Sequence, residues 1–356
     1  MRRISNRLLL VVLLAFATIS SMQAQFSTTF AKNAVPNQNN GVFYSLPSTM
    51  LKLDFTIVET ENIEGPLSEY ASTYFESAEI VDYSETSYQL LGVDMHVMTC
   101  ADPNATFFVS FTSGRGSVKT NFNILPNGII SSVGIDNQVE IVAAQEIGEA
   151  PVQVLDDNHF MSIMTNGKSQ SMIAKDMADK IEEIRKAKFN LISGYYETAL
   201  DPLTFQKMYS ELEAMEKEYI SLFVGKRIVK QVVKSVFVTP SKEISTQTVA
   251  KFSDTEGLTV GTSGTGSPIL VQTLSMNTTS NINTISQSAI ESMSYENKVF
   301  YRIPETANIK VMYNGETLVE KREVVNQLGV LLLVPVSNMG LQFDVNTGQI
   351  VNVKMQ

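Results

Sequence analysis

A proline-containing phrase occurs twice in the chain, each time directly before a strand-like pattern. The first copy is FYSLPSTMLKL (Phe43 to Leu53), and the second, about 260 residues later, is FYRIPETANIKV (Phe300 to Val311). Apolar and polar residues alternate after each proline, which is typical of a half-buried β-strand. We interpret the two copies as openings of two β units of similar construction. Duplication and chance agreement of a common strand opening are both compatible with one sequence.

Three turn signals interrupt the β-rich runs. They are Pro126-Asn127-Gly128, Asn314-Gly315 and Asn346-Thr347-Gly348. Asn and Gly tolerate a positive φ, so such pairs between strand-like runs indicate hairpins. The sequence therefore predicts an N-terminal antiparallel β domain over residues 42–165 and a C-terminal β domain over residues 227–356.

The segment between the two β units has a helical texture. Apolar residues recur at helical spacing from Ile173 to Leu191 and from Phe205 to Leu222. Asp201 followed by Pro202 is a typical helix start. Residues 166–226 are therefore predicted to form an antiparallel helical hairpin, and the fold class to be α+β, with antiparallel β-rich units flanking this hairpin. Its apolar faces either pack on a neighbouring sheet as a spacer or dock a partner.

Residues 261–294 form a low-charge stretch rich in Ser, Thr, Asn and Gly. A structureless loop of this length is unusual within a compact domain and tends to be either flexible or functional. We therefore expect a long polar loop here, which is a candidate lid over a ligand.

The N-terminal residues have the layout of a secretory signal peptide. Basic residues precede the apolar run Leu8 to Ala17, and small residues follow it. We expect residues 1–24 to be the signal peptide, with cleavage between Ala24 and Gln25. A polar tether is then expected over residues 25–41. Because no cysteine would open the processed chain, a lipoprotein is not expected.

The charge balance narrows the class of partner. The chain has 27 basic and 37 acidic residues, and removal of a signal peptide with three arginines leaves a net charge near −13. Such a surface argues against binding to a nucleic-acid backbone. Cys100 is the only cysteine, so no internal disulfide is possible, and no further apolar run approaches the ~20 residues of a membrane span.

Catalytic and metal-binding patterns are absent from the sequence. The two histidines, His96 and His159, belong to no metal-binding spacing, and Asp156 to His159 (DDNH) is more typical of a turn. The glycine-rich Gly261 to Gly266 (GTSGTG) misses the spacing of a serine elbow and lacks the lysine of a phosphate loop. The sequence therefore names no catalytic residue, no metal ligand and no cofactor.

Sugar binding has little support in the composition. Tryptophan, the largest stacking platform for a sugar ring, is absent. Tyr195 and Tyr196, at the expected tip between the helices, offer a smaller platform, although tyrosines there more often serve as packing residues. The sequence does not identify ligand-binding residues.

Four segments resemble a known family. YSLPST, IEEIRKAKFNLISG, LFVGK (Leu222 to Lys226) and YRIPETANIKV are similar, in this order, to the Bacteroidota envelope family catalogued as domain of unknown function 4831. The resemblance covers nearly all of the processed chain. It implies an exported, mixed β and helical protein of unassigned activity, and it supplies no catalytic or binding residues.

These observations favour an exported, non-enzymatic envelope protein of unassigned activity that acts as a protein-interaction scaffold. We expect it in the periplasm or associated with the cell envelope, bound to an envelope protein partner. The alternative is a module that binds a small ligand or glycan, with residues 261–294 as a lid. A hydrolase whose site is assembled from loops ranks third.

Overall fold

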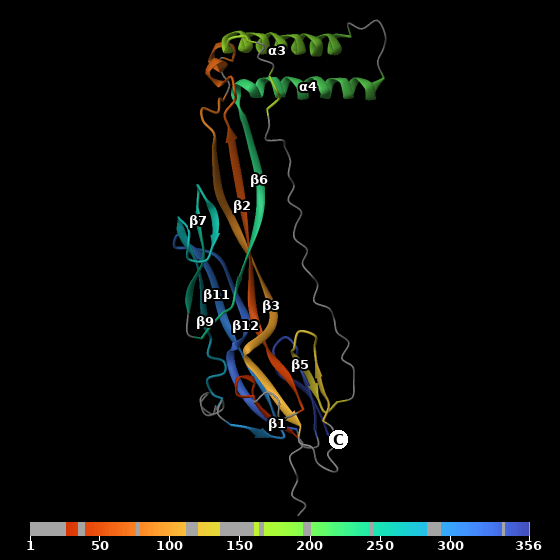
Figure 1. Cartoon of the computed structure of the whole chain (residues 1–356), viewed down its shortest axis with the longest axis vertical. Coiled ribbons are helices and arrows are strands. Elements are labelled where there is room, and N and C mark those ends of the chain that lie inside the picture. Colours follow the sequence, from red (N-terminus) through yellow and green to blue (C-terminus); the bar gives the residue numbers. More distant parts are fainter. Residues whose placement is uncertain are drawn as a thin grey trace, which may run out of the picture.

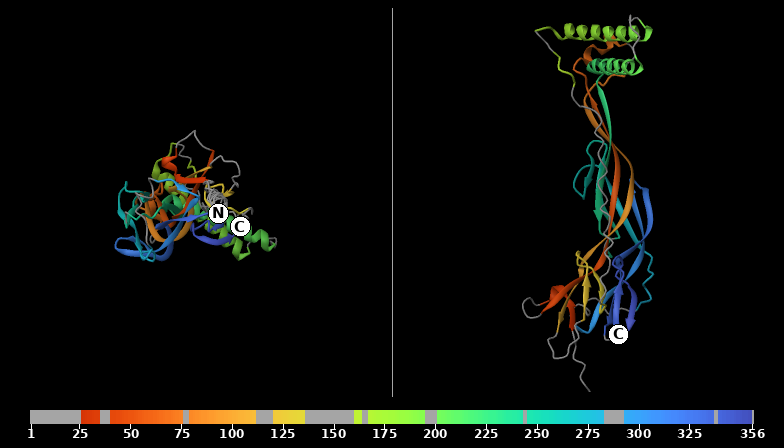
Figure 2. Two further views of the ribbon diagram at one scale, coloured as in Figure 1. Left: turned by 90° about the horizontal axis from the view of Figure 1, so that it is seen from below. Right: turned by 90° about the vertical axis from the view of Figure 1, so that its right-hand side faces the viewer.

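A computed structural model describes most of the chain after the expected signal peptide. The described residues are 26–34, 40–75, 79–111, 120–135, 160–163, 167–194, 201–242, 245–282, 293–336 and 339–355. The expected signal peptide, with its cleavage site at Ala24 and Gln25, lies outside these residues. The chain forms an elongated β-rich body with a pair of helices across one end (Figure 1). The view from the side shows the same arrangement (Figure 2).

Three sheets with antiparallel pairing between their strands build the body, which makes the protein a β-rich α+β fold. Sheet A has the order β10 (Tyr295–Glu296), β1 (Phe26–Phe30), β3 (Glu85–Phe111), β2 (Gly41–Ile63) and β6 (Lys226–Val238). Sheet B has the order β14 (Ile350–Met355), β13 (Met339–Phe343), β5 (Ile130–Val133) and β4 (Phe122–Ile124). Sheet C has the order β12 (Glu316–Pro335), β11 (Lys298–Tyr313), β9 (Ser267–Ser275), β7 (Thr246–Ser253) and β8 (Gly257–Val260).

The described helical elements lie mostly at one end of the body. The two long helices are α3 (Gln170–Ser193) and α4 (Pro202–Val224), and the short ones are η1 (Ala31–Asn33), η2 (Ser68–Tyr70) and α2 (Ala71–Tyr74). Asp201 caps α4 by accepting hydrogen bonds from the backbone N–H groups of Leu203 and Thr204, both at 3.1 Å. The two long helices therefore begin and end close to the positions that the sequence predicts.

The division into an N-terminal β domain (42–165) and a C-terminal β domain (227–356) is wrong. β6 pairs with β2 over thirteen residue pairs, β10 pairs with β1, and β13 pairs with β5. Sheets A and B therefore each combine strands from both halves of the chain. Sequence periodicity identifies strands but does not say which strands share a sheet, and this is where the prediction failed.

Two sequence segments expected to be irregular are strands instead. Residues 26–30, assigned to the polar tether, form β1, in which Phe26, Thr28 and Phe30 are buried. Residues 267–275, assigned to the long polar loop 261–294, form β9, in which Ile269 and Val271 are buried. Low charge and many hydroxyl residues obscured a regular alternation in both segments.

The strand that follows the first phrase has the predicted alternation. Leu51, Leu53, Phe55 and Ile57 of β2 are all at most 2% exposed and pack between sheets A and C. The register is fixed because a slip of one residue would turn this entire apolar row to solvent. All three predicted hairpin turns are confirmed, and the one joining β11 to β12 has positive φ at both Asn314 and Gly315.

The two proline-containing phrases interrupt their hairpins in the same way. In the first hairpin Ser45 pairs with Thr106 and Ser48 with Cys100, so three steps along β2 correspond to six along β3. In the second, Arg302 pairs with Leu331 and Glu305 with Val325, again three steps against six. The break lies directly before Pro47 in the first hairpin and at Pro304 in the second, and proline has no N–H to donate to the ladder. The hairpins β2–β3 and β11–β12 thus have the same register shift next to the repeated phrase.

The two phrases also touch each other. The backbone N–H of Phe300 donates a 2.9 Å hydrogen bond to the hydroxyl of Tyr44, and the Phe300 ring stacks on Phe107 with centroids 4.3 Å apart. Tyr44, Phe107 and Phe300 are fully buried, and burial raises the pKa of Tyr44 well above its ordinary range. This aromatic contact joins the lower halves of the two hairpins.

Buried polar contacts join the hairpins at their proline breaks. The Arg302 guanidinium lies 2.7 Å from a carboxylate oxygen of Asp102 and donates a 2.8 Å hydrogen bond to the carbonyl of Pro47. From the same hairpin as Arg302, the Gln327 amide accepts a hydrogen bond from the backbone N–H of Thr49 and donates one to its carbonyl, both at 2.9 Å. Backbone polar groups at the break of β2–β3 therefore find their hydrogen-bond partners on side chains of β11–β12.

We expect Asp102→Ala to lower the free energy of unfolding by about 3–5 kcal/mol, because it leaves the Arg302 charge buried and unpaired. Replacing both partners, Asp102→Leu with Arg302→Met, should recover much of this loss. Glu182→Ala, which removes an exposed ion pair with Lys186, should cost less than about 1 kcal/mol and serves as the control. Urea unfolding measures all three. Equal losses for Asp102→Ala and Glu182→Ala would contradict the buried contact.

Glu305 fastens the segment after β9 to sheet C. Its carboxylate is 2% exposed and accepts hydrogen bonds from the backbone N–H and the hydroxyl of both Thr278 and Thr279. Burial acts to raise the pKa of Glu305, but these hydrogen bonds outweigh it and lower the pKa to about 2. Part of the sequence expected to form a free loop is therefore bound to the body.

Because its folded pKa lies below the unfolded value, Glu305 stabilises the protein above about pH 4.5, and this contribution is lost as the pH falls toward 2. We expect Glu305→Gln to lower the free energy of unfolding at pH 7 by about 3 kcal/mol. It should also flatten the dependence of that free energy on pH between these values. The control is Glu316→Gln at the exposed start of β12. A pH profile of Glu305→Gln that matched the unsubstituted protein would refute this assignment.

Candidate functional site

The helical end, defined here as α3 and α4, is the candidate functional site. A separate apolar cluster holds it to the body, with Leu222 and Phe223 of α4 fully buried against Leu67, Ala71 and Ile173. The N–H of Leu67 donates a 2.9 Å hydrogen bond to the carbonyl of Leu222. The base of the helical end is therefore packed like a protein interior.

The apolar stripe of α4 is covered only in part. The sequence predicts one stripe through Phe205, Met208, Leu212, Met215, Tyr219 and Leu222. Leu222 is fully buried, but Phe205 is 37% exposed and Met215 is 48% exposed. Away from its base, α4 thus leaves apolar side chains of its stripe in contact with solvent.

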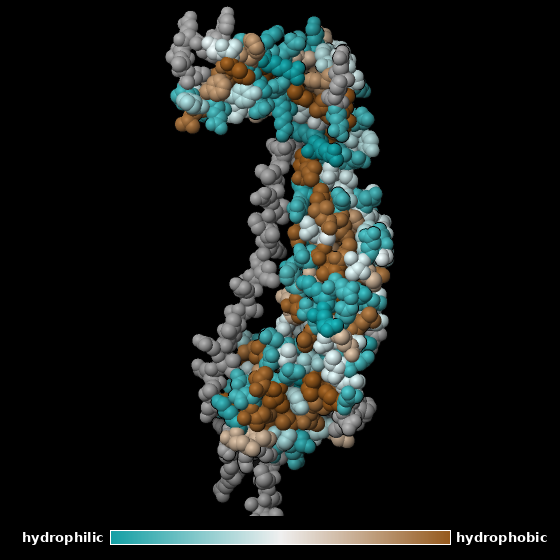
Figure 3. Space-filling view, turned by 180° about the vertical axis from the view of Figure 1, so that it is seen from behind, coloured by the Kyte–Doolittle hydropathy of each residue, from teal (hydrophilic) through white to brown (hydrophobic). Residues whose placement is uncertain are grey.

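Three more apolar side chains are exposed where α3 ends and α4 begins. Phe189 is 70% exposed, Ile192 is 62% exposed and Leu203 is 78% exposed. None of them belongs to the apolar stripes that the sequence predicts, so sequence reasoning missed them. Single exposed apolar residues are ordinary, but a group on neighbouring turns of two helices is typical of a binding surface. Viewed from behind, hydrophobic side chains lie among hydrophilic ones at this end (Figure 3).

A charged network links the two helices beside this surface. Glu216 of α4 accepts a hydrogen bond from Arg185 Nε at 2.7 Å and another from Lys188 Nζ at 3.0 Å. Burial acts to raise the pKa of Glu216, but the hydrogen bonds with Arg185 and Lys188 outweigh it, so the pKa is lowered. Lys188 also lies over the Tyr209 ring, 5.1 Å from its centroid. These contacts fix how α3 and α4 lie against each other.

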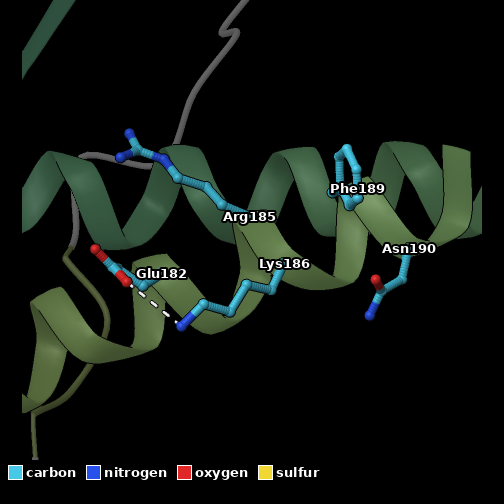
Figure 4. Close-up of a pocket in the computed structure, with 5 residues that line it drawn as sticks. All are labelled: Glu182, Arg185, Lys186, Phe189 and Asn190. Atoms are coloured by element: carbon cyan, nitrogen blue, oxygen red, sulfur yellow. Dashed lines mark ion pairs between the residues drawn. The ribbon is translucent and has the colours of Figure 1, made fainter. Parts of the chain in front are cut away.

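A hollow of about 340 Å³ opens on the surface of α3. It is lined by five residues of one helix face: Glu182, Arg185, Lys186, Phe189 and Asn190. Glu182 pairs with Lys186 at 3.5 Å, while Arg185 and Phe189 point away from this pair (Figure 4). Because a single helix supplies all of the lining, the hollow fits a side chain of a binding partner better than an enclosed small ligand.

The described side chains of the helical end are apolar groups and charged groups that pair with each other. Among the residues that the structure describes, no group of three or more His, Cys, Asp or Glu side chains is placed to hold a metal ion. The charged side chains near the hollow pair with each other. What the surface presents is apolar area bordered by charges, which is the usual composition of a protein-binding patch.

Two residues that the sequence singles out, His96 and Cys100, lie on β3 and not on the helices. His96 is half exposed on β3, with Nε2 3.7 Å from a carboxylate oxygen of Asp54. Cys100, also on β3, is half buried; burial and the charge of Asp102 raise the pKa of its thiol. Such a thiol is a poor nucleophile. Among the described residues, the contacts of these two side chains are those with Asp54 for His96 and with the carbonyl of Ser48 for Cys100.

Gly261 to Gly266 form a turn between β8 and β9, with positive φ at all three glycines of this stretch. The Gly264 carbonyl accepts a 3.1 Å hydrogen bond from Lys251 Nζ. His159, the DDNH turn, Tyr195 and Tyr196 lie outside the described residues.

Comparison with known proteins identifies a family without an assigned activity. The family described as "Domain of unknown function (DUF4831)" matches residues 40–350, so the chain belongs to this family. The resemblance seen in the sequence is thereby confirmed. No curated protein and no solved structure matches the chain. Within the described part of the chain, no helix has the length and apolar character needed to cross a membrane.

The exposed apolar residues of the helical end are expected to contribute little to folding. We expect Phe189→Ser and Leu203→Ser to change the free energy of unfolding by less than about 0.5 kcal/mol. Leu222→Ala at the buried base should instead lower it by about 2–5 kcal/mol. Thermal and urea unfolding compare the three variants. A large loss for either serine variant would mean that the side chain is part of the core.

Proposed function

We propose that this protein is an exported, non-enzymatic component of the cell envelope that acts as a protein-interaction scaffold. Its α3 and α4 form an antiparallel helical hairpin, and the free end of this hairpin binds an envelope protein. Phe189 and Ile192 lie near the end of α3 and Leu203 lies near the start of α4, so in such a hairpin all three belong to one end of the helix pair, which we call the apolar tip. Export by an N-terminal signal peptide, residues 1–24, accounts for the envelope location.

The observation that carries this proposal is the exposure of the apolar tip. Phe189 and Leu203 are more than two-thirds exposed, while the base of the same helices is fully buried. Keeping a large apolar side chain in water forgoes about 1.5–3 kcal/mol that burial would provide. A tip of this kind is explained by a partner that covers it.

The position of the helices adds support. The long strands β2, β3 and β6 run from the body to the helical end, so the helices lie beyond sheets B and C (Figure 1). A partner has access to the tip without meeting the sheets. The hollow beside Phe189 provides a place for one partner side chain.

The alternative of a ligand-binding module with residues 261–294 as its lid loses its main support. Residues 267–275 are a strand of sheet C with Ile269 and Val271 buried, and Glu305 binds the segment that follows. What remains of the expected lid in the described residues is a turn between two strands. We therefore do not favour this alternative.

In-cell crosslinking of the tagged full-length protein tests the proposal. The variant Phe189→Glu with Leu203→Glu places charges on the apolar tip and is expected to reduce capture of a specific partner at least tenfold, since two buried charges cost well over 1.4 kcal/mol. The matched control is Val351→Glu with Val353→Glu, which alters exposed apolar residues of β14 at the other end of the body.

A partner lost with the helical variant and kept with the β14 variant supports the scaffold. Equal capture by both variants would reject the apolar tip as the binding surface. If the purified processed protein turned over substrates in a hydrolase panel, the non-enzymatic assignment would be wrong.

A further inference from the structure

The lower half of β12 is an apolar strand with a single strand neighbour in the described part of the chain. Residues 328–336 read LGVLLLVPV and contain no polar or charged side chain. A continuous apolar run is typical of a strand that is enclosed by its neighbours. β12 is nevertheless the last strand of sheet C, where β11 is its described partner, and all side chains from residue 330 to residue 334 remain partly exposed.

The backbone groups of Leu331 and Leu333 point away from β11. Phe300 pairs with Leu333, but its N–H donates to a tyrosine hydroxyl on β2. Arg302 pairs with Leu331, but its N–H donates to the carbonyl of Gly348. In an antiparallel ladder, both members of such a pair turn their N–H and C=O groups away from each other. The groups of Leu331 and Leu333 therefore lie at the outer edge of sheet C, where no described residue is hydrogen-bonded to them.

This open stretch is closed at both ends. At its start, Lys242 Nζ donates a 2.7 Å hydrogen bond to the carbonyl of Gly329. At its end, Pro335 has no N–H to donate to another strand. A further strand therefore finds its hydrogen-bonding partners mainly at Leu331 and Leu333.

Other open edges of the described sheets carry charges, have neighbours or are short. The open edge of β3 carries Asp94, that of β6 carries Lys230 and that of β14 carries Lys354. Charges and short length are usual protections against pairing with a further strand, and the edge strands β4, β8 and β10 have at most four residues. The lower half of β2 has a neighbour, because Ser45 donates a hydrogen bond to the carbonyl of Gly128. The run from residue 330 to residue 334 has none of these protections among the described residues.

We propose that a second copy of this chain pairs with this edge, antiparallel and with two-fold symmetry about Leu332. The β11–β12 hairpins of the two copies then form one continuous sheet. This inference goes beyond the proposed function, because it concerns another surface and depends on nothing proposed for the helices.

The edge is complementary to itself in this register. Leu331 of one copy stands opposite Leu333 of the other, and each such pair exchanges both of its N–H to C=O hydrogen bonds. Val330 stands opposite Val334, and Leu332 stands opposite its own copy, so every facing pair is apolar. No like charges meet, although such contacts would destabilise the pairing of charged edges.

The closed ends of the stretch favour a second copy over an unrelated strand. In the two-fold register, Gly329 of one copy stands opposite Pro335 of the other. The carbonyl that Lys242 occupies therefore faces the residue that has no N–H. A second copy matches both ends by symmetry, because the same surface is used on each subunit of a two-fold interface.

Cysteine crosslinking of the purified processed protein tests the register. In a Cys100→Ser background, Leu332→Cys places the two introduced thiols in a non-hydrogen-bonded pair, with Cα atoms about 4.5 Å apart. This separation lies within the range that a disulfide spans. We expect Leu332→Cys to form linked dimers at least tenfold faster than Val330→Cys. Val330→Cys should crosslink rapidly only when it is mixed with the Val334→Cys chain.

The three positions lie on one face of β12 and are all partly exposed, so differences between them report the register and not access to the oxidant. Equal rates for Leu332→Cys and Val330→Cys alone would overturn the two-fold pairing. The absence of linked dimers from every variant and mixture would also overturn it. A link from position 332 to a different protein in cells would reject the second copy as the occupant.

Sedimentation equilibrium supplies a second measurement that needs no cysteine. We expect the unsubstituted protein to dimerise and Leu332→Lys, which places like charges opposite each other at the two-fold axis, to raise the Kd at least tenfold. The control is Val324→Lys, an exposed position of the same strand outside the apolar run, which should leave the Kd unchanged. An unsubstituted protein that stays monomeric would refute the proposal. If circular dichroism shows that Leu332→Lys does not fold, the cysteine variants decide.

Discussion

The buried contact between Arg302 and Asp102 is the constraint on which the rest of the architecture depends. Two charges removed from water are tolerated only when each is paired and hydrogen-bonded, and here the Pro47 carbonyl and the Asn104 N–H complete the set. The contact forms only if the hairpins β2–β3 and β11–β12 cross at their proline breaks. It thereby fixes which parts of the two hairpins face each other. The hydrogen bonds between Gln327 and Thr49 hold the hairpins in the same relative position.

The crossing of the two hairpins divides the apolar residues of the long strands into two cores. Above it, the apolar rows of β2 and β11 face each other and bury one core; below it, aromatic residues of both phrases bury a second. With both cores closed, β2 and β6 continue past sheet C and reach the helices. The helical end then has its own small core at the base, while Phe189, Ile192 and Leu203 near the other end of the helices stay exposed. This exposure is the basis of the proposed partner site.

Much of the local structure was predictable because it is encoded over a few residues. The alternation from Leu51 to Ile57, the Asn314-Gly315 turn and the Asp201-Pro202 helix start each specify a backbone conformation without help from distant residues. Two strands were wrongly predicted to be irregular because their composition is typical of loops. β1 and β9 contain Ser and Thr in place of charges, but their alternating Phe26 and Phe30, or Ile269 and Val271, were a usable signal. No pattern in the sequence indicated that Phe189 and Leu203 would be exposed.

The sequence by itself determined the elements: the strands after each proline, the three hairpin turns, the two long helices and the membership of a family without an assigned activity. Their positions are fixed by short-range periodicity and turn chemistry. The tertiary structure alone decided that sheets A and B mix both halves of the chain, that the repeated phrases meet at Tyr44 and Phe300, and that part of the apolar surface of α4 stays in solvent. Those outcomes depend on contacts between residues up to about 280 positions apart, which no local pattern records.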